Sequence, residues 1–365
     1  MLAFVGTLNR KLVYFPAANG PGIGVFAYDE ATGGFTKLHE VGGIDNPGYL
    51  VLNAAGDRLY AVSEVFGWHE GVVTAYRIDR ATGAVSYINK QATRGNITVH
   101  VNLDATGRWL FVANYLLGPD GARPPQAVAV FPVEQDGGIG APVATVAHQG
   151  SGPNVARQEM PHPHSAVPSP DNRRVLVPDL GIDQVLTYRF DTADGTLNLV
   201  HKVSLPPGAG PRSLAFHPNG RFAFVTLEMG NAVAALGWDS AGSTKLEQVA
   251  GTLPEGWEGE STCSDLVIAP DGRFLYVANR GHDSIAVFTI EPASGRLSLV
   301  QHAKTHGATT RHITLDLTGR YLLAANQNGD AVVALARDAA TGRLAETARV
   351  APIGSPMCVR LLRAD

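Results

Sequence analysis

The chain has 365 residues, of which 45% are hydrophobic and 17% are charged, so it is long enough to bury a large core. A formal net charge of −4 and a sequence with no Lys/Arg-rich block exclude the basic surface that is typical of nucleic-acid-binding proteins. Only two cysteines occur, Cys263 and Cys358, which excludes a disulfide framework and favours a reducing compartment.

The first predicted element is the N-terminal run "LAFVGT", within "MLAFVGTLNRKLVYF". It lacks the basic start and the longer apolar stretch of a secretory signal. No apolar segment approaches the roughly 18 residues that a membrane-spanning helix needs. We therefore expect a cytoplasmic protein with neither a membrane nor a nucleic acid as partner.

The next elements are short β-rich runs with turn residues between them. "GIGVFAYD" and "TKLHEV" follow the first run, and a unit of about fifty residues then recurs. Each unit contains four predicted strands and no stretch of helical period. In each unit the first two strands flank a turn residue, here called the anchor, and the anchors are Gly56, Gly107, Asn172, Gly220, Gly272 and Gly319.

The spacings between successive anchors are 51, 65, 48, 52 and 47 residues. The one long interval contains "ARPPQ" and "HQGSGPNVARQEMPHPH", which we interpret as inserted loops. Radially repeated four-stranded units are typical of a β-propeller. A sandwich or barrel does not explain the fixed period.

The last element, "SPMCVRLL", is predicted to be the innermost strand of a sheet, with no outer strands after it in the chain. The N-terminal runs are predicted to be outer strands of a sheet, with no innermost strand before them. Joining them in one sheet completes a seventh unit, which an open solenoid does not explain. The sequence thus predicts an all-β, seven-bladed propeller with four antiparallel strands per blade. We expect residues 1–365 to form a single domain, as a monomer or weak homo-oligomer.

Positions equally far from an anchor should emerge at the same end of its hairpin. Eight residues before the anchors stand Gly48, Val99, His164, Arg212, Ser264 and Arg311. Eight after stand Glu64, Tyr115, Leu180, Glu228, Arg280 and Gln327, and seven after stand Ser63, Asn114, Asp179, Leu227, Asn279 and Asn326. We expect these residues to line one rim of a central funnel.

Two interpretations of this polar set remain open. Asn114, Asn279, Asn326 and Asp179 either contact a ligand or satisfy backbone groups at equivalent strand ends. Asp183, Asn231, Asp283 and Asp330 recur in the following turn and are assigned to turn chemistry.

Three arginines, Arg212, Arg280 and Arg311, would repel one another in a small funnel without an anion. Because the guanidinium fork suits carboxylate or phosphate, they predict an anionic small molecule as ligand. Glu228 or His164 is then the candidate acid–base group. No cofactor is expected.

His162 and His164 stand two residues apart, a spacing that could also bind a metal ion. Asp179 is the one evident third ligand, and the neighbouring arginines disfavour a cation. We therefore predict no metal site, and assign His164 to the chemistry and His162 to a loop beside it.

Three segments carry a family resemblance: "RQEMPHPHSAVPSPDNRRVLVPDLGIDQV", "GPRSLAFHPNGRFAFVTLE" and "APDGRFLYVANRGHDSIAVF". The chain resembles, over nearly its whole length, the cytosolic lactonase family of seven-bladed propellers. That family includes bacterial propeller-type 6-phosphogluconolactonases and the fungal 3-carboxy-cis,cis-muconate lactonizing enzyme. "TTRH" at 309–312 and the longer N-terminal segment "LNRKLVYFPAANGPG" depart from the family pattern.

The resemblance implies a catalytic set of one His, two Arg and one Glu, matched here by His164, Arg212, Glu228 and Arg280. It also implies a lactonase that hydrolyses a sugar lactone resembling 6-phosphogluconolactone. The alternatives are a cycloisomerase of the carboxymuconate type and, less favoured, a non-enzymatic scaffold. The expected substrate-binding residues are Arg311, Asp179, Gln327, Arg157, Asn279 and Glu64.

Overall fold

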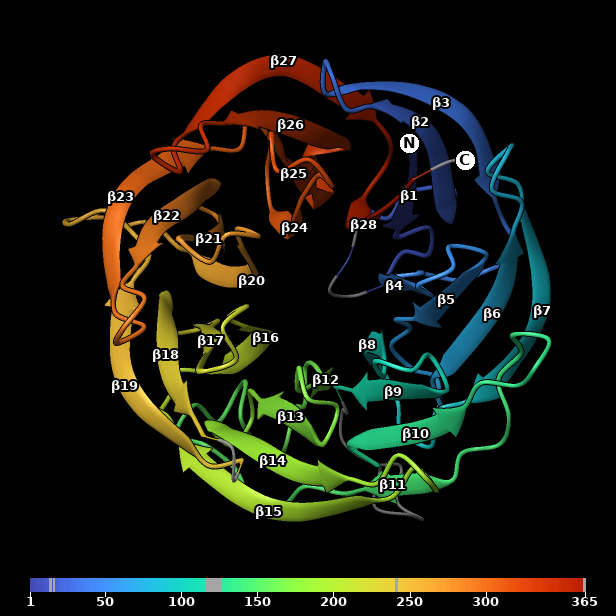
Figure 1. Cartoon of the computed structure of the whole chain (residues 1–365), viewed down its shortest axis with the longest axis horizontal. Helices are drawn as coiled ribbons and strands as arrows, with labels where there is room; N and C mark the ends of the chain where they lie inside the picture. Colours follow the sequence, from blue (N-terminus) through green and yellow to red (C-terminus); the bar gives the residue numbers. More distant parts are fainter. Residues whose placement is uncertain (13–14, 16, 116–125, 240–241, 364–365) are drawn as a thin grey trace. The chain divides into compact units, whose positions relative to one another are not determined.

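The computed structural model describes residues 1–12, 15, 17–115, 126–239 and 242–363. Most of the expected "ARPPQ" insertion, residues 122–125, and part of the long N-terminal segment lie outside these ranges. The described residues form seven antiparallel sheets of four strands each (Figure 1). The fold is therefore all-β, a seven-bladed β-propeller, as the repeat predicts.

The chain divides into two compact units, and the second comprises Asp45–Arg212 and Asp239–Thr244. Unit 2 holds three sheets. The first contains β4 (Tyr49–Leu52), β5 (Arg58–Ser63), β6 (Val72–Ile78) and β7 (Val85–Ala92). The next contains β8 (Thr98–Leu103), β9 (Trp109–Asn114), β10 (Val128–Pro132) and β11 (Ala144–Val146). The third contains β12 (Val167–Pro168), β13 (Arg174–Asp179), β14 (Gln184–Phe190) and β15 (Leu197–Ser204).

Unit 1 comprises Met1–Ile44, Ser213–Trp238 and Lys245–Asp365 and holds the other four sheets, apart from the first residues of β16 and β19. One contains β16 (Pro211–Phe216), β17 (Phe222–Leu227), β18 (Ala232–Trp238) and β19 (Thr244–Gly251). The next contains β20 (Thr262–Ile268), β21 (Phe274–Arg280), β22 (Ser284–Ile290) and β23 (Leu297–Lys304). A third contains β24 (Thr310–Leu315), β25 (Tyr321–Asn326), β26 (Ala331–Arg337) and β27 (Leu344–Pro352), with the short 3-10 helix η1 (Gln327–Gly329) after β25.

The fourth sheet of unit 1 joins the two ends of the chain. Its order is β28 (Pro356–Leu362), β1 (Leu2–Thr7), β2 (Ile23–Asp29) and β3 (Gly34–Val41). Cys358 pairs with Gly6 in the β28–β1 ladder, and all six residues of β1 are buried. The shared terminal sheet is confirmed, and it leaves β1 without an open edge.

The six anchors all lie in the first hairpin of their sheets, with φ angles between 58° and 73°. Glycine adopts this left-handed conformation without strain, and asparagine is the side chain that tolerates it best. The anchor is the third of four loop residues, because Asn53 N–H bonds Arg58 O and Gly56 N–H bonds Asn53 O.

Because of this turn geometry, the strand register is offset by one residue from a pairing symmetric about the anchor. Leu52 pairs with Leu59, whereas symmetry about Gly56 would pair it with Tyr60. A β-bulge between Cys263 and Leu266 adds a further residue, so that Arg280 pairs with Thr262. Counting from the anchors therefore identified the correct end of each hairpin, but not the cross-strand partner.

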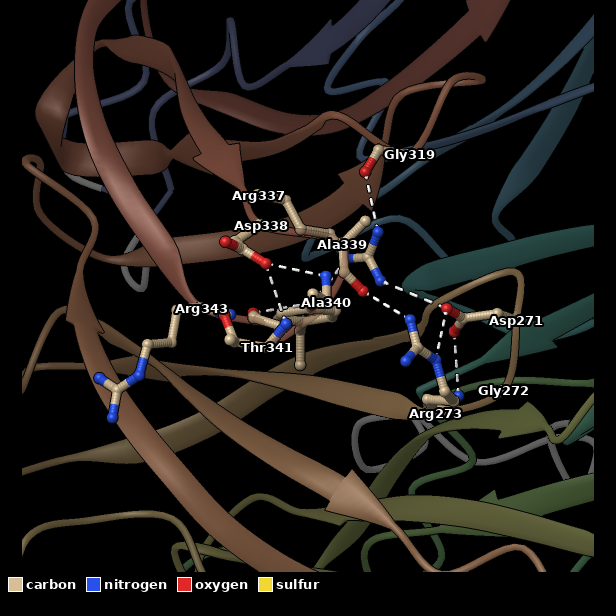
Figure 2. Close-up of polar contacts among 12 residues, drawn as sticks. Asp271, Gly272, Arg273, Gly319, Arg337, Asp338, Ala339, Ala340, Thr341 and Arg343 are labelled. Carbon is tan, nitrogen blue, oxygen red and sulfur yellow. Dashed lines mark hydrogen bonds and ion pairs between the residues drawn. The ribbon is translucent and has the colours of Figure 1, made fainter.

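The core consists of side chains from facing sheets. One cluster in unit 1 joins Tyr276 and Val287 of one sheet with Leu322 and Leu335 of the next, all at most 1% exposed. Hydrogen bonds and ion pairs close to the turns also link the same pair of sheets (Figure 2). Arg337 Nη1 donates to Gly319 O at 3.0 Å, and its Nη2 lies 3.9 Å from Asp271 Oδ2.

Candidate active site

Glu228 and Arg280 form a buried ion pair in unit 1. Glu228 directly follows β17 and Arg280 ends β21, so each occupies the end of the second strand of its sheet. Arg280 Nη2 lies 3.0 Å from Glu228 Oε2, and the two side chains are 12% and 5% exposed. The structure thus brings together two of the four predicted catalytic residues.

The backbone of Cys263 in β20 holds both members of this pair. Its N–H donates to Glu228 O at 3.0 Å, and its carbonyl accepts from Arg280 Nη2 at 3.1 Å. Burial raises the pKa of the Cys263 thiol to about 12, although the Thr252 hydroxyl and Arg280 act in the opposite direction. Cys263 therefore stays a neutral thiol near the pair and is no candidate nucleophile.

Two predicted ligand-binding residues belong to another sheet of unit 1, Arg311 in β24 and Gln327 directly after β25. The Arg311 guanidinium lies 5.6 Å from the centre of the Phe15 ring, a cation–π contact. Gln327, at the start of η1, donates from Nε2 to Asn328 Oδ1 at 3.2 Å. Its amide oxygen is buried with no hydrogen-bond partner among the described residues.

The ion pair weakens the argument that the arginines need an external anion. Glu228 already supplies a counter-charge to Arg280, and Phe15 contacts Arg311. The expectation of an anionic ligand therefore depends on fewer arginines than the sequence suggested.

In unit 2, Tyr115 connects several predicted residues. Its ring stacks on His162 with centroids 4.4 Å apart, and meets His164 edge-on at 5.8 Å. Arg157 Nη2 donates to the Tyr115 hydroxyl at 3.4 Å. His162 Nδ1 lies 2.9 Å from Tyr115 O and Nε2 lies 3.3 Å from Glu159 Oε2, so both ring nitrogens face acceptors. His162 thus supports Tyr115.

Asp179 has a structural environment. It is fully buried, and its Oδ1 accepts from the backbone N–H groups of His162 at 2.7 Å and Gly181 at 3.0 Å. Its Oδ2 lies 2.6 Å from His148 Nδ1, and His148 Nε2 lies 2.8 Å from the Tyr188 hydroxyl. Burial and the Asp179 charge raise the pKa of Tyr188. These contacts favour the strand-end interpretation of Asp179 over ligand binding.

Asn279 is likewise committed to the fold. Its Oδ1 accepts from the Thr252 hydroxyl at 2.8 Å, and its Nδ2 donates to Thr252 O at 2.9 Å. Asn114 and Asn326 are bonded in a similar way. Their Oδ1 atoms accept from the hydroxyls of Thr98 and Thr310, and their Nδ2 atoms donate to the carbonyls of Thr93 and Thr305. The strand-end interpretation is therefore favoured for the asparagines, and Asn279 is better described as a support for Arg280.

Glu64 and Arg212 are buried in unit 2, at 3% and 5% exposure. Glu64 packs over Gly48, where a Cβ atom would lie 2.6 Å from its Oε2. The backbone carbonyl of Arg212 accepts from the Ser165 hydroxyl at 3.0 Å. That His164 and Arg212 join Glu228 and Arg280 in one site stays a prediction.

The comparisons with known proteins decide the family. Residues 3–361 match the family model described as "Lactonase, 7-bladed beta-propeller". The chain belongs to this lactonase family.

Relatives of this lactonase share most of its length. It is 36% identical over 318 residues to a 6-phosphogluconolactonase of Bacillus subtilis, which covers 87% of this chain and 85% of the relative. It is similar to the solved structure of the periplasmic gluconolactonase of Pseudomonas aeruginosa, with 33% identity, a TM-score of 0.90 and full coverage of both chains. A putative 6-phosphogluconolactonase of Bacteroides fragilis gives 28% identity and a TM-score of 0.88 over 99% and 98% of the two chains. The expectation of an enzyme is confirmed over that of a scaffold.

The described residues show neither a metal-binding cluster nor a membrane-spanning helix. Among the described residues, no group of three or more His, Cys, Asp or Glu side chains is arranged to hold a metal ion. No helix in the described ranges is long and apolar enough to cross a membrane.

The sequence predicts that Tyr115 lies at the rim but gives it no role, although its position in the repeat matches those of Glu228 and Arg280.

Proposed function

We propose that this lactonase hydrolyses a small anionic sugar lactone, such as 6-phosphogluconolactone, in a central funnel. The observation that carries the proposal is the buried ion pair of Glu228 and Arg280 in a chain of the lactonase family. The printed names of the relatives, a 6-phosphogluconolactonase and a gluconolactonase, support a sugar lactone as substrate. His164 and Arg212 complete the proposed catalytic set.

The reaction needs a base for water and donors for the developing oxyanion. Glu228 takes a proton from water as the water oxygen bonds to the lactone carbonyl carbon. His164 is the alternative base. Guanidinium carries five N–H groups, so Arg280 can bond Glu228 and Cys263 O and still donate to the carbonyl oxygen. Collapse of the tetrahedral intermediate breaks the ring C–O bond, and protonation of the leaving oxygen gives the open hydroxy acid.

The phosphate of the substrate would be held away from the reacting carbon. Arg311 is the main candidate because a guanidinium fork suits phosphate oxygens, and its contact with Phe15 holds one face of the guanidinium. Arg157 is a second candidate, and Gln327 and Glu64 are proposed to bond sugar hydroxyl groups.

The test uses purified protein and measures acid release in a pH-stat. Glucono-δ-lactone and 6-phosphogluconolactone are offered in parallel, with spontaneous hydrolysis subtracted, and carboxymuconate is followed by ultraviolet absorbance. We expect catalysed hydrolysis of a sugar lactone, faster with the phosphorylated one, and no turnover of carboxymuconate. Failure to accelerate hydrolysis of either lactone would overturn the proposal.

We further propose that the enzyme works in the cytoplasm. Both cysteines are buried free thiols, which suits a reducing compartment. The Pseudomonas relative is described as periplasmic, so the compartment is tested directly. Cell fractionation with an antibody against the protein should place it with cytoplasmic markers, and recovery in an osmotic-shock fraction would contradict this.

A further inference from the structure

Thr252 contacts both of the elements that carry the Glu228–Arg280 ion pair. It directly follows β19 and is fully buried. Its N–H donates to Asn231 O at 2.9 Å, and its hydroxyl lies at the same distance from that oxygen. Asn231 closes the turn that begins at Glu228, so these bonds hold the chain after the carboxylate. The carbonyl of Thr252 accepts from Asn279 Nδ2 at 2.9 Å, and Asn279 directly precedes Arg280 in β21.

The hydroxyl of Thr252 also contacts side chains beside the pair. It lies 2.8 Å from Asn279 Oδ1 and 3.1 Å from Cys263 Sγ. Cys263 is the residue whose N–H bonds Glu228 O and whose carbonyl accepts from Arg280 Nη2. Thr252 therefore touches the residue that holds both members of the pair and the residue that comes directly before the arginine.

The next sheet of unit 1 has an equivalent residue, Thr305, with the same backbone bonds. The Thr305 N–H donates to Asp283 O at 3.1 Å, and its carbonyl accepts from Asn326 Nδ2 at 3.1 Å. The hydroxyl differs, because it bonds the carbonyls of Asp283 and Gly307. In that sheet the donor to Asn326 Oδ1 is instead the hydroxyl of Thr310, at 2.7 Å.

Cys263 explains the difference between the two sheets. It pairs with Asn279 in the strand ladder. Thr310 pairs with Asn326 in the same way, so a thiol stands where the next sheet has a hydroxyl. A thiol is a weak donor, and Cys263 Sγ lies 3.5 Å from Asn279 Oδ1. The Thr252 hydroxyl is therefore the stronger donor to Asn279 in the sheet that carries Arg280.

We propose that Thr252 is a positioning residue, which fixes the separation and orientation of Glu228 and Arg280 through its contacts with Asn279 and Cys263. All of these residues belong to unit 1. Because Thr252 is fully buried, it acts through its neighbours and not on the substrate. The inference goes beyond the proposed lactone hydrolysis and rests on it, since the ion pair is the part of the site that Thr252 serves.

The decisive variant is Thr252→Val, which removes the hydroxyl and keeps the shape of the side chain. We expect kcat to fall roughly 10–100-fold with KM within about twofold of wild type, because misplaced catalytic groups slow the reaction more than they weaken binding. Thr252→Ser restores the hydroxyl and should retain most of the wild-type kcat. Wild-type kcat in Thr252→Val, or an equal loss in the valine and serine variants, would overturn the proposal.

Thr305→Val is the matched control. It removes an equally buried hydroxyl from the equivalent place in the next sheet, where Thr310 is the donor to the asparagine. The urea midpoint should fall about as much as in Thr252→Val, while kcat stays close to wild type. A similar fall in kcat in both variants would show that lost stability lowers turnover, and would overturn the positioning role.

A second substitution tests the bond to Asn279 directly. Cys263→Thr in the Thr252→Val background places a hydroxyl where Thr310 has one in the next sheet. This donor should restore part of the lost kcat. A soluble double variant with no recovery would overturn the role of the bond to Asn279.

Failure of this inference is distinct from failure of the proposed function. A crystal structure of Thr252→Val measures the positioning without turnover, and the separation of Arg280 Nη2 and Glu228 Oε2 should exceed the 3.0 Å of the wild type. An unchanged separation would overturn the inference. Wild-type protein without lactonase activity would instead overturn the proposed function.

Discussion

Arg280 Nη2 lies 3.0 Å from Glu228 Oε2 at equivalent strand ends of two neighbouring sheets. One residue, Cys263, donates its N–H to Glu228 O and accepts from the Arg280 guanidinium at its carbonyl. The fold thus positions a carboxylate and its cation before any substrate binds. Because both side chains are largely removed from water, loss of either partner has consequences for stability as well as chemistry.

Glu228→Gln should retain the fold and lose most activity. The amide oxygen can still accept from Arg280, but an amide cannot take a proton from water. We expect kcat to fall by about 10²–10⁴-fold with little change in thermal midpoint. Glu247→Gln, at a carboxylate whose side chain is 38% exposed, is the control. A near-wild-type kcat in the Glu228→Gln variant would show that Glu228 is not the base.

Arg280→Ala should impair both activity and stability. It leaves the Glu228 carboxylate buried without its cation, a change that typically costs about 3–5 kcal/mol. We expect a lower urea midpoint together with a fall in kcat/KM. Arg273→Ala removes an arginine whose side chain is 52% exposed and should leave kinetics unchanged. A stable but inactive Arg280→Ala protein would show that the pair contributes only to chemistry.

The blade repeat was predictable because left-handed turns require glycine or asparagine, and these residues recur at fixed spacing. The hydrogen-bond partners of the side chains at the strand ends could not be predicted from the sequence. Asn279 is bonded by Thr252, which lies 27 residues earlier in the preceding connection, and no local pattern reports this contact. The bulge at Cys263 is also invisible in composition, yet it decides which residue faces Arg280.

Asp179→Asn should lower stability without altering substrate affinity. The substitution weakens the bonds to His148 and to two backbone N–H groups, all of them buried. Loss of part of this network is expected to cost roughly 1–3 kcal/mol of unfolding free energy, measured by urea denaturation. KM for the lactone should stay within about twofold of wild type, a difference of about 0.4 kcal/mol. A large rise in KM with normal stability would show that Asp179 binds the ligand.

Stability should decline as the pH falls below about 6.5, because two histidines in unit 1, one buried and one half-buried, favour their neutral forms in the fold. Burial lowers the pKa of His282, with Lys304 and His302 acting in the same direction, and burial lowers the pKa of His302 despite its backbone bond to Thr252. Their unfolded forms bind protons first, so the stabilisation is complete above the unfolded pKa and is lost as the pH drops through the folded values.

Urea midpoints measured from pH 8 to pH 5 check this expectation. The wild-type midpoint should fall across the range, and His302→Gln should show a shallower decline because one of the two titrating groups is removed. His306, whose side chain is 37% exposed, supplies the control variant His306→Gln, which should follow the wild-type curve. Identical pH dependence in wild type and His302→Gln would contradict the assignment.

Removal of β28 should abolish folding. Deletion of residues 356–365 takes away the strand that pairs with β1 from Leu2 to Thr7 and carries the buried residues Met357, Cys358 and Val359. Because every residue of β1 is buried, its unpaired backbone groups and apolar side chains would face water, an edge that promotes aggregation. We expect insoluble protein, or a soluble form that binds a hydrophobic dye and melts without a cooperative transition. Deletion of residues 363–365 alone leaves the strand intact and should not change the thermal midpoint. A monomeric protein with a sharp melting transition after the longer deletion would show that the terminal pairing is dispensable.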